Sequence, residues 1–156
     1  MTTSLAIAAV LAGGLLAGLS VDRTLVALPA WRKVGPEAWA AFSRDADLGN
    51  GLVVYPLLGV GAPLLSLGVG GSFALDPGVA AAGLPILAAA LISVAHLLAT
   101  ARAAPNMAKI RSARDRIALQ QAFDAFERWQ RVRAILQSLT FAANIWALVA
   151  VLGGSL

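Results

Sequence analysis

Polar side chains recur along one apolar stretch near the C-terminal end of this 156-residue chain. They follow steps of three, four, three and four residues and are Gln130, Arg133, Gln137, Thr140 and Asn144. At 3.6 residues per helical turn, these steps place all five on one narrow face of a helix. The guanidinium on that face could bind an anion, stabilise an oxyanion or extend to lipid headgroups. Arg133 is therefore a candidate catalytic group, and the other four are candidate binding residues.

A second polar set lies in another apolar stretch. Ser93, His96 and Thr100 also follow steps of three and four, so they share one face of a helix, and Thr100 is a further candidate binding residue. His96, the single histidine, could act as a general base, an axial haem ligand or a plain hydrogen-bond partner. The stretch holds no second histidine, cysteine or carboxylate to complete a ligand set, so we predict no metal site. We also predict no resident cofactor, with a haem or a bound quinone left open.

The composition makes both polar sets unusual. Hydrophobic residues make up 59% of the chain and charged residues 13%, against about 25% charged in average soluble domains. Polar groups in hydrocarbon cost free energy and usually face a bundle interior or a cavity. The two sets therefore either hydrogen-bond to each other between helices or line a pocket that is entered from the cytoplasm or the inner leaflet. Both alternatives stay open here.

Four stretches without a charged residue must carry these side chains. They cover residues 1–21, 48–75, 77–101 and 134–156. About 20 apolar residues are enough for a helix to cross a bilayer, and a helix satisfies its own backbone there. We predict one all-α domain, a bundle of four transmembrane helices. The predicted spans are about 4–28, 51–72, 79–102 and 133–153.

A further helix is predicted before the last span. Its apolar residues recur at helical spacing between Arg and Asp residues, and are Met107, Ile110, Ile117, Phe126 and Trp129. Pro105 can end the preceding helix. We therefore predict a cytoplasmic amphipathic helix over 106–132 that runs without a break into the last span.

The positive charges predict the topology. All twelve Lys and Arg residues lie at or between the first and second spans, or at or between the third and fourth. The positive-inside rule places both basic loops in the cytoplasm and both termini outside, in an integral, multi-pass membrane protein. Trp31, Trp39 and Trp129 flank these loops, where an aromatic belt would place them. Because anionic lipid accounts for the basic charge, we predict the lipid bilayer as a partner and no nucleic acid.

Two further features concern partners. Tyr55 lies just inside the second span and could reach the cytoplasmic pocket, so it is a candidate binding residue for a hydrophobic small molecule. Gly14 and Gly18 form a GxxxG pair, which lets helices approach closely within a bundle or between protomers. A homo-oligomer through the Gly14/Gly18 face is therefore an expected assembly.

The chain resembles a family of small four-helix membrane proteins, mostly of unknown function, that includes the anthrone oxygenases. The resemblance is carried by GGLLAGLS and LPAWR in and after the first span, Pro105 and Asn106 after the third, and FERWQRVRAILQ before the fourth. In the last element, Trp129, Gln130 and Arg133 match a family pattern of Trp, a polar residue and Arg. Gln130 stands where the family pattern has Asn or His.

This resemblance implies an oxidoreductase that converts an anthrone to an anthraquinone with molecular oxygen and without a cofactor. In that mechanism His96 would remove a proton, Arg133 would stabilise the oxyanion and Trp129 would flank the aromatic ring. Asn106 would join the binding residues. The alternatives are a structural or accessory protein that binds lipid, and a transporter subunit. The transporter ranks last because the spans hold no carboxylate and no inverted repeat.

Overall fold

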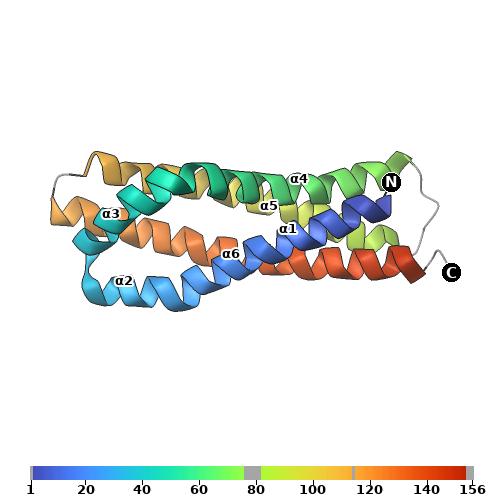
Figure 1. Ribbon diagram of the computed structural model, residues 1–156, viewed down its shortest axis with the longest axis horizontal. Coiled ribbons are helices and arrows are strands. Elements are labelled where there is room, and N and C mark those ends of the chain that lie inside the picture. Colours follow the sequence, from blue (N-terminus) through green and yellow to red (C-terminus); the bar gives the residue numbers. More distant parts are fainter. Residues whose placement is uncertain (1, 76–81, 114, 154–156) are drawn as a thin grey trace.

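The structure, a computed structural model, describes residues 2–75, 82–113 and 115–153. Over these ranges the chain is almost entirely helical and forms a bundle of four long helical segments (Figure 1). Each segment is long and apolar enough to cross a membrane, over Thr2–Val34, Pro36–Leu75, Gly83–Arg111 and Arg116–Gly153. The prediction of an all-α chain with four candidate membrane spans is confirmed. Residues 79–81 of the third predicted span lie outside the described residues.

Three of these segments consist of more than one helical element. The elements are α1 (Thr2–Asp22), η1 (Arg23–Ala27), α2 (Leu28–Val34), α3 (Pro36–Asp45), η2 (Ala46–Asn50), α4 (Gly51–Leu75), α5 (Gly83–Ala108), η4 (Lys109–Arg111) and α6 (Arg116–Gly153). Both η1 and η2 are single π-helical turns, which occur frequently at functional sites. The chain reverses at Gly35, whose φ of 96° lies in the left-handed region that favours glycine.

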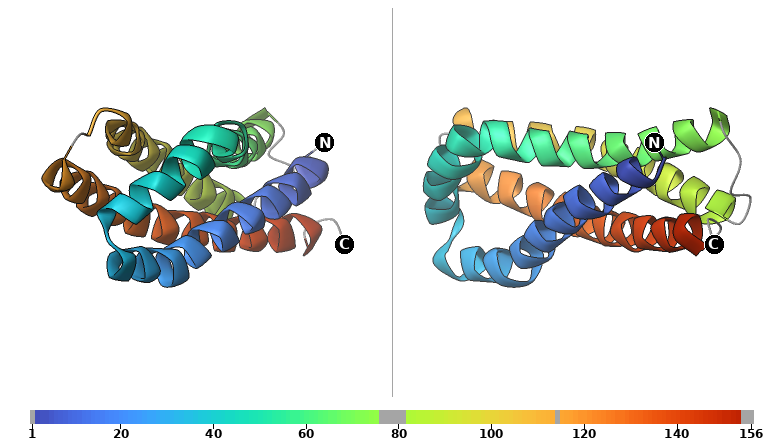
Figure 2. Two further views of the ribbon diagram at one scale, coloured as in Figure 1. Left: turned by 60° about the vertical axis from the view of Figure 1, so that its left-hand side comes forward. Right: turned by 45° about the vertical axis from the view of Figure 1, so that its right-hand side comes forward.

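Each long helix has its main contacts with two neighbours. Helices α1 and α5 both pack against α4 and α6, so the order around the bundle is α1, α4, α5, α6. Helix α1 begins and α6 ends at one end of the bundle, while α2 and α3 lie at the other end (Figures 1 and 2). We call this second end, which also contains η4, the α3 end.

The helix predicted over 106–132 has a different beginning. Helix α5 continues through Pro105 to Ala108, so Asn106 lies in its last turn, and α6 begins only at Arg116. The prediction that Pro105 ends the helix was wrong. Ala103 and Asn106 are buried on either side of the proline, and this packing outweighs the one backbone hydrogen bond that proline removes. The predicted continuity into the last span is confirmed, because α6 is unbroken to Gly153.

An aromatic core holds the α3 end together. Trp39 is fully buried, with its ring centroid 5.0 Å from that of Phe123 and 5.7 Å from that of Phe126. Leu28 and Ile110 belong to the same buried cluster, which joins α2, α3, η4 and α6. The expectation that Trp39 belongs to an aromatic belt was wrong. Because α3 folds back onto α6, its indole is buried in protein instead of facing lipid headgroups.

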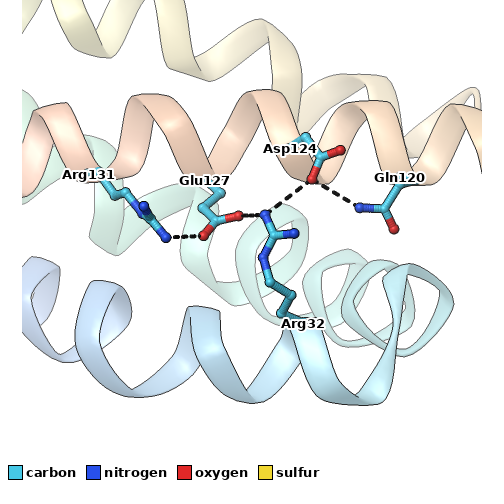
Figure 3. A network of polar contacts seen from close by, with 5 residues as sticks. All are labelled: Arg32, Gln120, Asp124, Glu127 and Arg131. Carbon is cyan, nitrogen blue, oxygen red and sulfur yellow. Dashed lines mark hydrogen bonds and ion pairs between the residues drawn. The ribbon is translucent and has the colours of Figure 1, made fainter.

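A polar network joins α2 to the same part of α6 (Figure 3). The buried carboxylate of Glu127 accepts hydrogen bonds from Arg32 and from Arg131, the latter at 2.5 Å. Arg32 also pairs with Asp124 at 3.3 Å. Both arginines are more than half exposed, so each pair contributes modestly to stability. The network fixes α2 beside α6.

Candidate functional site

A cavity of about 480 Å³ lies between the long helices toward the α3 end. Its wall is mostly apolar and takes residues from α1, η1, η2, α4, α5, η4 and α6. Several apolar wall residues, among them Leu19, Leu52 and Val60, are also exposed. The cavity therefore reaches the apolar outer surface, and its volume is that of a small-molecule site.

The first polar group on the wall comes from α5 and α6 and consists of Thr100, Gln130 and Arg133. Gln130 is 1% exposed, and its amide nitrogen has no hydrogen-bond partner. The buried Nε of Arg133 and the hydroxyl of Thr100 are also without a partner. Within the part of the chain that is described, neither a hydrogen bond nor an ion pair reaches Arg133. These donors have no hydrogen-bond partner among the described residues, and the charges of Arg23 and Asp47 on the same wall act on Arg133.

The second polar group consists of Arg23, Asp47 and Tyr55, which come from η1, η2 and α4. Arg23 forms an ion pair with Oδ1 of Asp47. Its Nη2 also donates to the Tyr55 hydroxyl at 3.2 Å, and its guanidinium carbon lies 4.8 Å from the centroid of the Tyr55 ring. Asp47 is 5% exposed, and its second oxygen, Oδ2, is buried without a hydrogen-bond partner.

The backbone around η2 places this second group. Gly49 has non-helical dihedral angles, with φ −101° and ψ −111°, where η2 passes into α4. A Cβ on Gly51 would lie 2.6 Å from the carbonyl oxygen of Ala46 and 2.5 Å from a ring carbon of Tyr55. Any side chain at position 51 would clash with the Tyr55 ring, so glycine is required there for Tyr55 to lie beside Arg23.

The polar face of α6 divides into two parts. Gln130 and Arg133 face the cavity, whereas Gln137 and Asn144 hydrogen-bond to other helices. Nε2 of Gln137 lies 2.8 Å from Nε2 of His96, so the amide donates and the ring nitrogen accepts. Asn144 donates to the hydroxyl of Ser66 on α4 at 2.8 Å. The sequence left two alternatives open, a pocket and interhelical hydrogen bonds. Both occur: the N-terminal part of this polar face lines the cavity, and the C-terminal part forms hydrogen bonds to other helices.

Four of the predicted site residues line the cavity: Thr100, Gln130, Arg133 and Tyr55. The remaining six, which do not belong to its described wall, are His96, Asn106, Trp129, Gln137, Thr140 and Asn144. Asn106 instead closes the last turn of α5, donating to the carbonyl of Arg102 at 3.0 Å and accepting from Lys109 at 3.2 Å. Trp129 is half-buried, and Thr140 is buried with its hydroxyl unpartnered.

Sequence reasoning missed Arg23 and Asp47 as wall residues. The one signal for them was an arginine at the end of one span and an aspartate just before the next. Their pairing depends on the two π-helical turns, which carry no signature that the sequence alone reveals.

Gly14 lies against α6 of the same chain. A Cβ on Gly14 would approach a ring carbon of Phe141 to 3.0 Å, while Gly18 has open space around it. The close helix approach allowed by Gly14 is therefore used within the bundle. A homo-oligomer through the Gly14/Gly18 face stays a prediction.

Neither a metal ligand set nor a known relative identifies the site. Among the described residues, no group of three or more His, Asp or Glu could hold a metal ion. The chain matches no protein-family model, no curated protein and no solved structure. The resemblance to the anthrone oxygenases therefore stays an expectation from the sequence.

The hydrogen bond between His96 and Gln137 yields a prediction about stability. In a double-mutant cycle of His96→Ala and Gln137→Ala, we expect a coupling energy of about 0.6 kcal/mol and at most about 1.7 kcal/mol, as for other interhelical hydrogen bonds in membrane proteins. The measurement is reversible unfolding in mixed detergent micelles. Additive effects of the two substitutions would show that the two side chains do not interact.

Proposed function

We propose that this integral membrane protein binds a lipophilic molecule that carries an anionic or strongly polarised oxygen atom. The observation that carries the proposal is Arg133, a cation on the wall of an apolar cavity that forms no hydrogen bond or ion pair with the described residues. An unpaired charge in such surroundings is costly, and an oxyanion on the ligand would supply its partner. Gln130 lies on the same wall, three residues away on α6.

The proposal includes an orientation and an entry route. The α3 end carries the basic residues, so the positive-inside rule assigns it to the cytoplasm, with both termini outside. The exposed wall residues Leu19, Leu52 and Val60 then face the inner half of the bilayer. A lipophilic ligand would enter sideways from the membrane and would not cross the aqueous phase.

We propose further that the ligand is an anthrone-type aromatic ketone and that the reaction is its oxidation by molecular oxygen. A base would take one proton from the carbon opposite the carbonyl, and the negative charge would move to the carbonyl oxygen, beside Arg133. The carbanion would add O2 to give a peroxide, which regains the proton as a hydroperoxide. Loss of water then leaves the second carbonyl, so one anthrone and one O2 give one anthraquinone and one water. The support is the sequence resemblance together with the placement of Arg133 on the wall.

The sequence assigned the proton-accepting role to His96. That side chain is 1% exposed and hydrogen-bonded to Gln137, outside the described cavity wall. A role for His96 in direct contact with the ligand therefore has less support than the role of Arg133.

A second candidate function is a non-catalytic one, in which the protein binds lipid or supports a larger complex. The observation that favours it is the pair of interhelical hydrogen bonds, His96 with Gln137 and Asn144 with Ser66. In this case the cavity would hold a membrane lipid whose phosphate or carboxylate pairs with Arg133, and no oxygen would be consumed.

The test uses the full chain purified in mild detergent. Mass spectrometry of the purified protein identifies a co-purified ligand, and oxygen uptake with absorbance spectroscopy follows the conversion of anthrone to anthraquinone. Anthraquinone formation with equal oxygen uptake would support the oxygenase reaction. Binding of anthrone without oxygen uptake would support the non-catalytic candidate, and failure to bind either anthrone or an anionic lipid would contradict both.

Gly59 offers a matched pair of variants for this test. It is buried on the cavity wall, and a Cβ there would meet no atom within 4 Å, so a larger side chain would extend into the cavity. We expect Gly59→Leu to weaken anthrone binding by about tenfold or more, because the ligand loses buried contact area. Gly71→Leu is the control, since Gly71 lies on the same helix with equally open surroundings but away from the cavity. Equal affinities for the two variants would show that the ligand binds elsewhere.

A further inference from the structure

An apolar groove between α1 and α4 adjoins the cavity and continues from it along α4. The groove has a volume of about 430 Å³, and Leu58 belongs to its wall as well as to the wall of the cavity. Helix α1 lies close to α4 near its own N-terminal end, where the Ser72 hydroxyl donates to Thr2 at 3.2 Å, and diverges from α4 toward the α3 end (Figures 1 and 2). The cavity and the groove therefore follow one another along the same seam between two helices.

The walls of the two spaces differ in chemistry. The groove wall consists of leucine, alanine and glycine, and no polar side chain of a described residue belongs to it. The cavity wall, in contrast, includes the cations Arg23, Arg111 and Arg133. A polar group in the groove would lose its hydration without gaining a partner, which is unfavourable. Together the two spaces match a molecule with an anionic oxygen at one end and a hydrocarbon chain at the other.

The length of the groove fits one such chain. From Leu58 to Gly68, the last α4 residue on the groove wall, the helix rises about 15 Å at 1.5 Å per residue. This is half of a hydrocarbon core about 30 Å thick, the distance that one lipid chain spans in its leaflet.

We infer that the groove holds the hydrocarbon tail of the same molecule whose oxygen binds Arg133. This inference rests on the proposed function and narrows its lipophilic ligand to one with a long hydrocarbon tail. In a bilayer every lipid chain competes for an apolar groove, so the hydrophobic effect alone selects none of them. A chain whose head is already bound in the adjoining cavity is held beside the groove at a high effective concentration, and this favours it over the others.

The experiment maps the position of a tail by photochemical labelling. The probe is hexadecanoic acid with a diazirine near its methyl end, added to the full chain in phosphatidylcholine vesicles, and peptide mass spectrometry identifies the labelled residues. The reference is Trp146, which is exposed on α6 at the depth of Gly68, because the next residues, Val69 and Ala147, belong to one buried cluster. We expect residues 57–68 to be labelled about tenfold more than the residues around Trp146.

Gly61→Leu tests whether the groove itself holds the tail. A Cβ at Gly61 would meet no atom within 4 Å, so the new side chain extends into the groove without a clash in the protein. We expect the excess labelling of residues 57–68 to fall to about twofold or less, because overfilling an apolar site usually costs about a factor of ten in affinity. Gly68→Leu, which meets the same conditions, repeats the test if Gly61→Leu does not fold. Gly71→Leu is the control, because Gly71 has equally open surroundings and lines neither space.

Arg133→Gln distinguishes a tail that belongs to the bound ligand from an ordinary lipid chain. Loss of the cation weakens the hold on the carboxylate, so we expect the excess labelling of residues 57–68 to disappear here as well. Excess labelling that persists in Arg133→Gln would show that bulk lipid fills the groove and would overturn the inference. Equal labelling of residues 57–68 and the residues around Trp146 in the unaltered protein would also overturn it.

Octanoic acid separates a failure of this inference from a failure of the proposed function. It has the same carboxylate but a chain half as long, and its dissociation constant for the full chain in detergent is measured by tryptophan fluorescence. Binding of octanoic acid that requires Arg133, without excess labelling of residues 57–68, would overturn the inference and leave the cavity as a ligand site. Absence of both binding and labelling would contradict the proposed function and this inference with it.

Discussion

Arg133→Gln is expected to weaken the binding of anthraquinone-type ligands by about 10- to 100-fold. A hydrogen bond to a charged group contributes about 1.5–3 kcal/mol, and each 1.4 kcal/mol is a factor of ten in affinity. Glutamine can still donate one hydrogen bond, so binding weakens but is not abolished. The measurement is the dissociation constant of the full chain in detergent, from the change in ligand absorbance.

The same substitution should not destabilise the empty protein. Arg133 has no described partner to lose, and removing an unpaired charge from apolar surroundings relieves a desolvation cost. We therefore expect the free energy of unfolding to stay the same or to rise. Arg128→Gln, which removes an exposed cation five positions earlier on α6, should change neither quantity. An unchanged ligand affinity in Arg133→Gln would contradict the role of Arg133.

Trp39→Ala is expected to have the largest effect on stability. The indole is fully buried and contacts the rings of Phe123 and Phe126, and truncation of a buried Trp usually costs about 3–5 kcal/mol of unfolding free energy. Because α3 leads directly into η2, loosening α3 should also displace Asp47 and weaken ligand binding. Chemical unfolding in detergent, followed by far-ultraviolet circular dichroism, measures the first effect.

Two controls accompany this prediction. Trp39→Phe keeps an aromatic ring, and because the indole nitrogen has no hydrogen-bond partner, we expect a much smaller loss. Trp146→Ala removes an indole that is 52% exposed on the outer face of α6, and we expect a change within about 0.5 kcal/mol. Equal losses for Trp39→Ala and Trp146→Ala would show that the buried aromatic core does not stabilise the α3 end.

The four long helices could be predicted from the sequence because the membrane imposes a simple rule, a run of about 20 apolar residues. The helices at the α3 end could not be predicted in the same way. Trp39 stands beside a basic loop, which is typical of a residue at the membrane interface, and only the packing of α3 on α6 shows that it is buried. Pro105 is a local signal for a helix end that tertiary contacts override.

The candidate site was predictable where its residues share one helix. Gln130 and Arg133 stand on one face of α6, and helical spacing alone brings them together. Arg23 and Asp47 are 24 residues apart and meet because α1 and α4 are neighbours, with the π-helical turn η1 following α1 and η2 preceding α4. Neither condition is a property of a short sequence window, so this half of the site required the three-dimensional structure.

The unpaired polar atoms of the cavity link ligand binding to the folding equilibrium. An empty cavity leaves Arg133 without a hydrogen bond or an ion pair among the described residues, so the ligand-free protein is the less stable form. A ligand at 100 times its dissociation constant stabilises a protein by about 2.7 kcal/mol. Thermal unfolding in the presence of fractionated membrane lipids would thus identify the natural ligand by the fraction that raises the melting temperature. In the cell, the same linkage would make the abundance of this protein depend on the supply of its ligand.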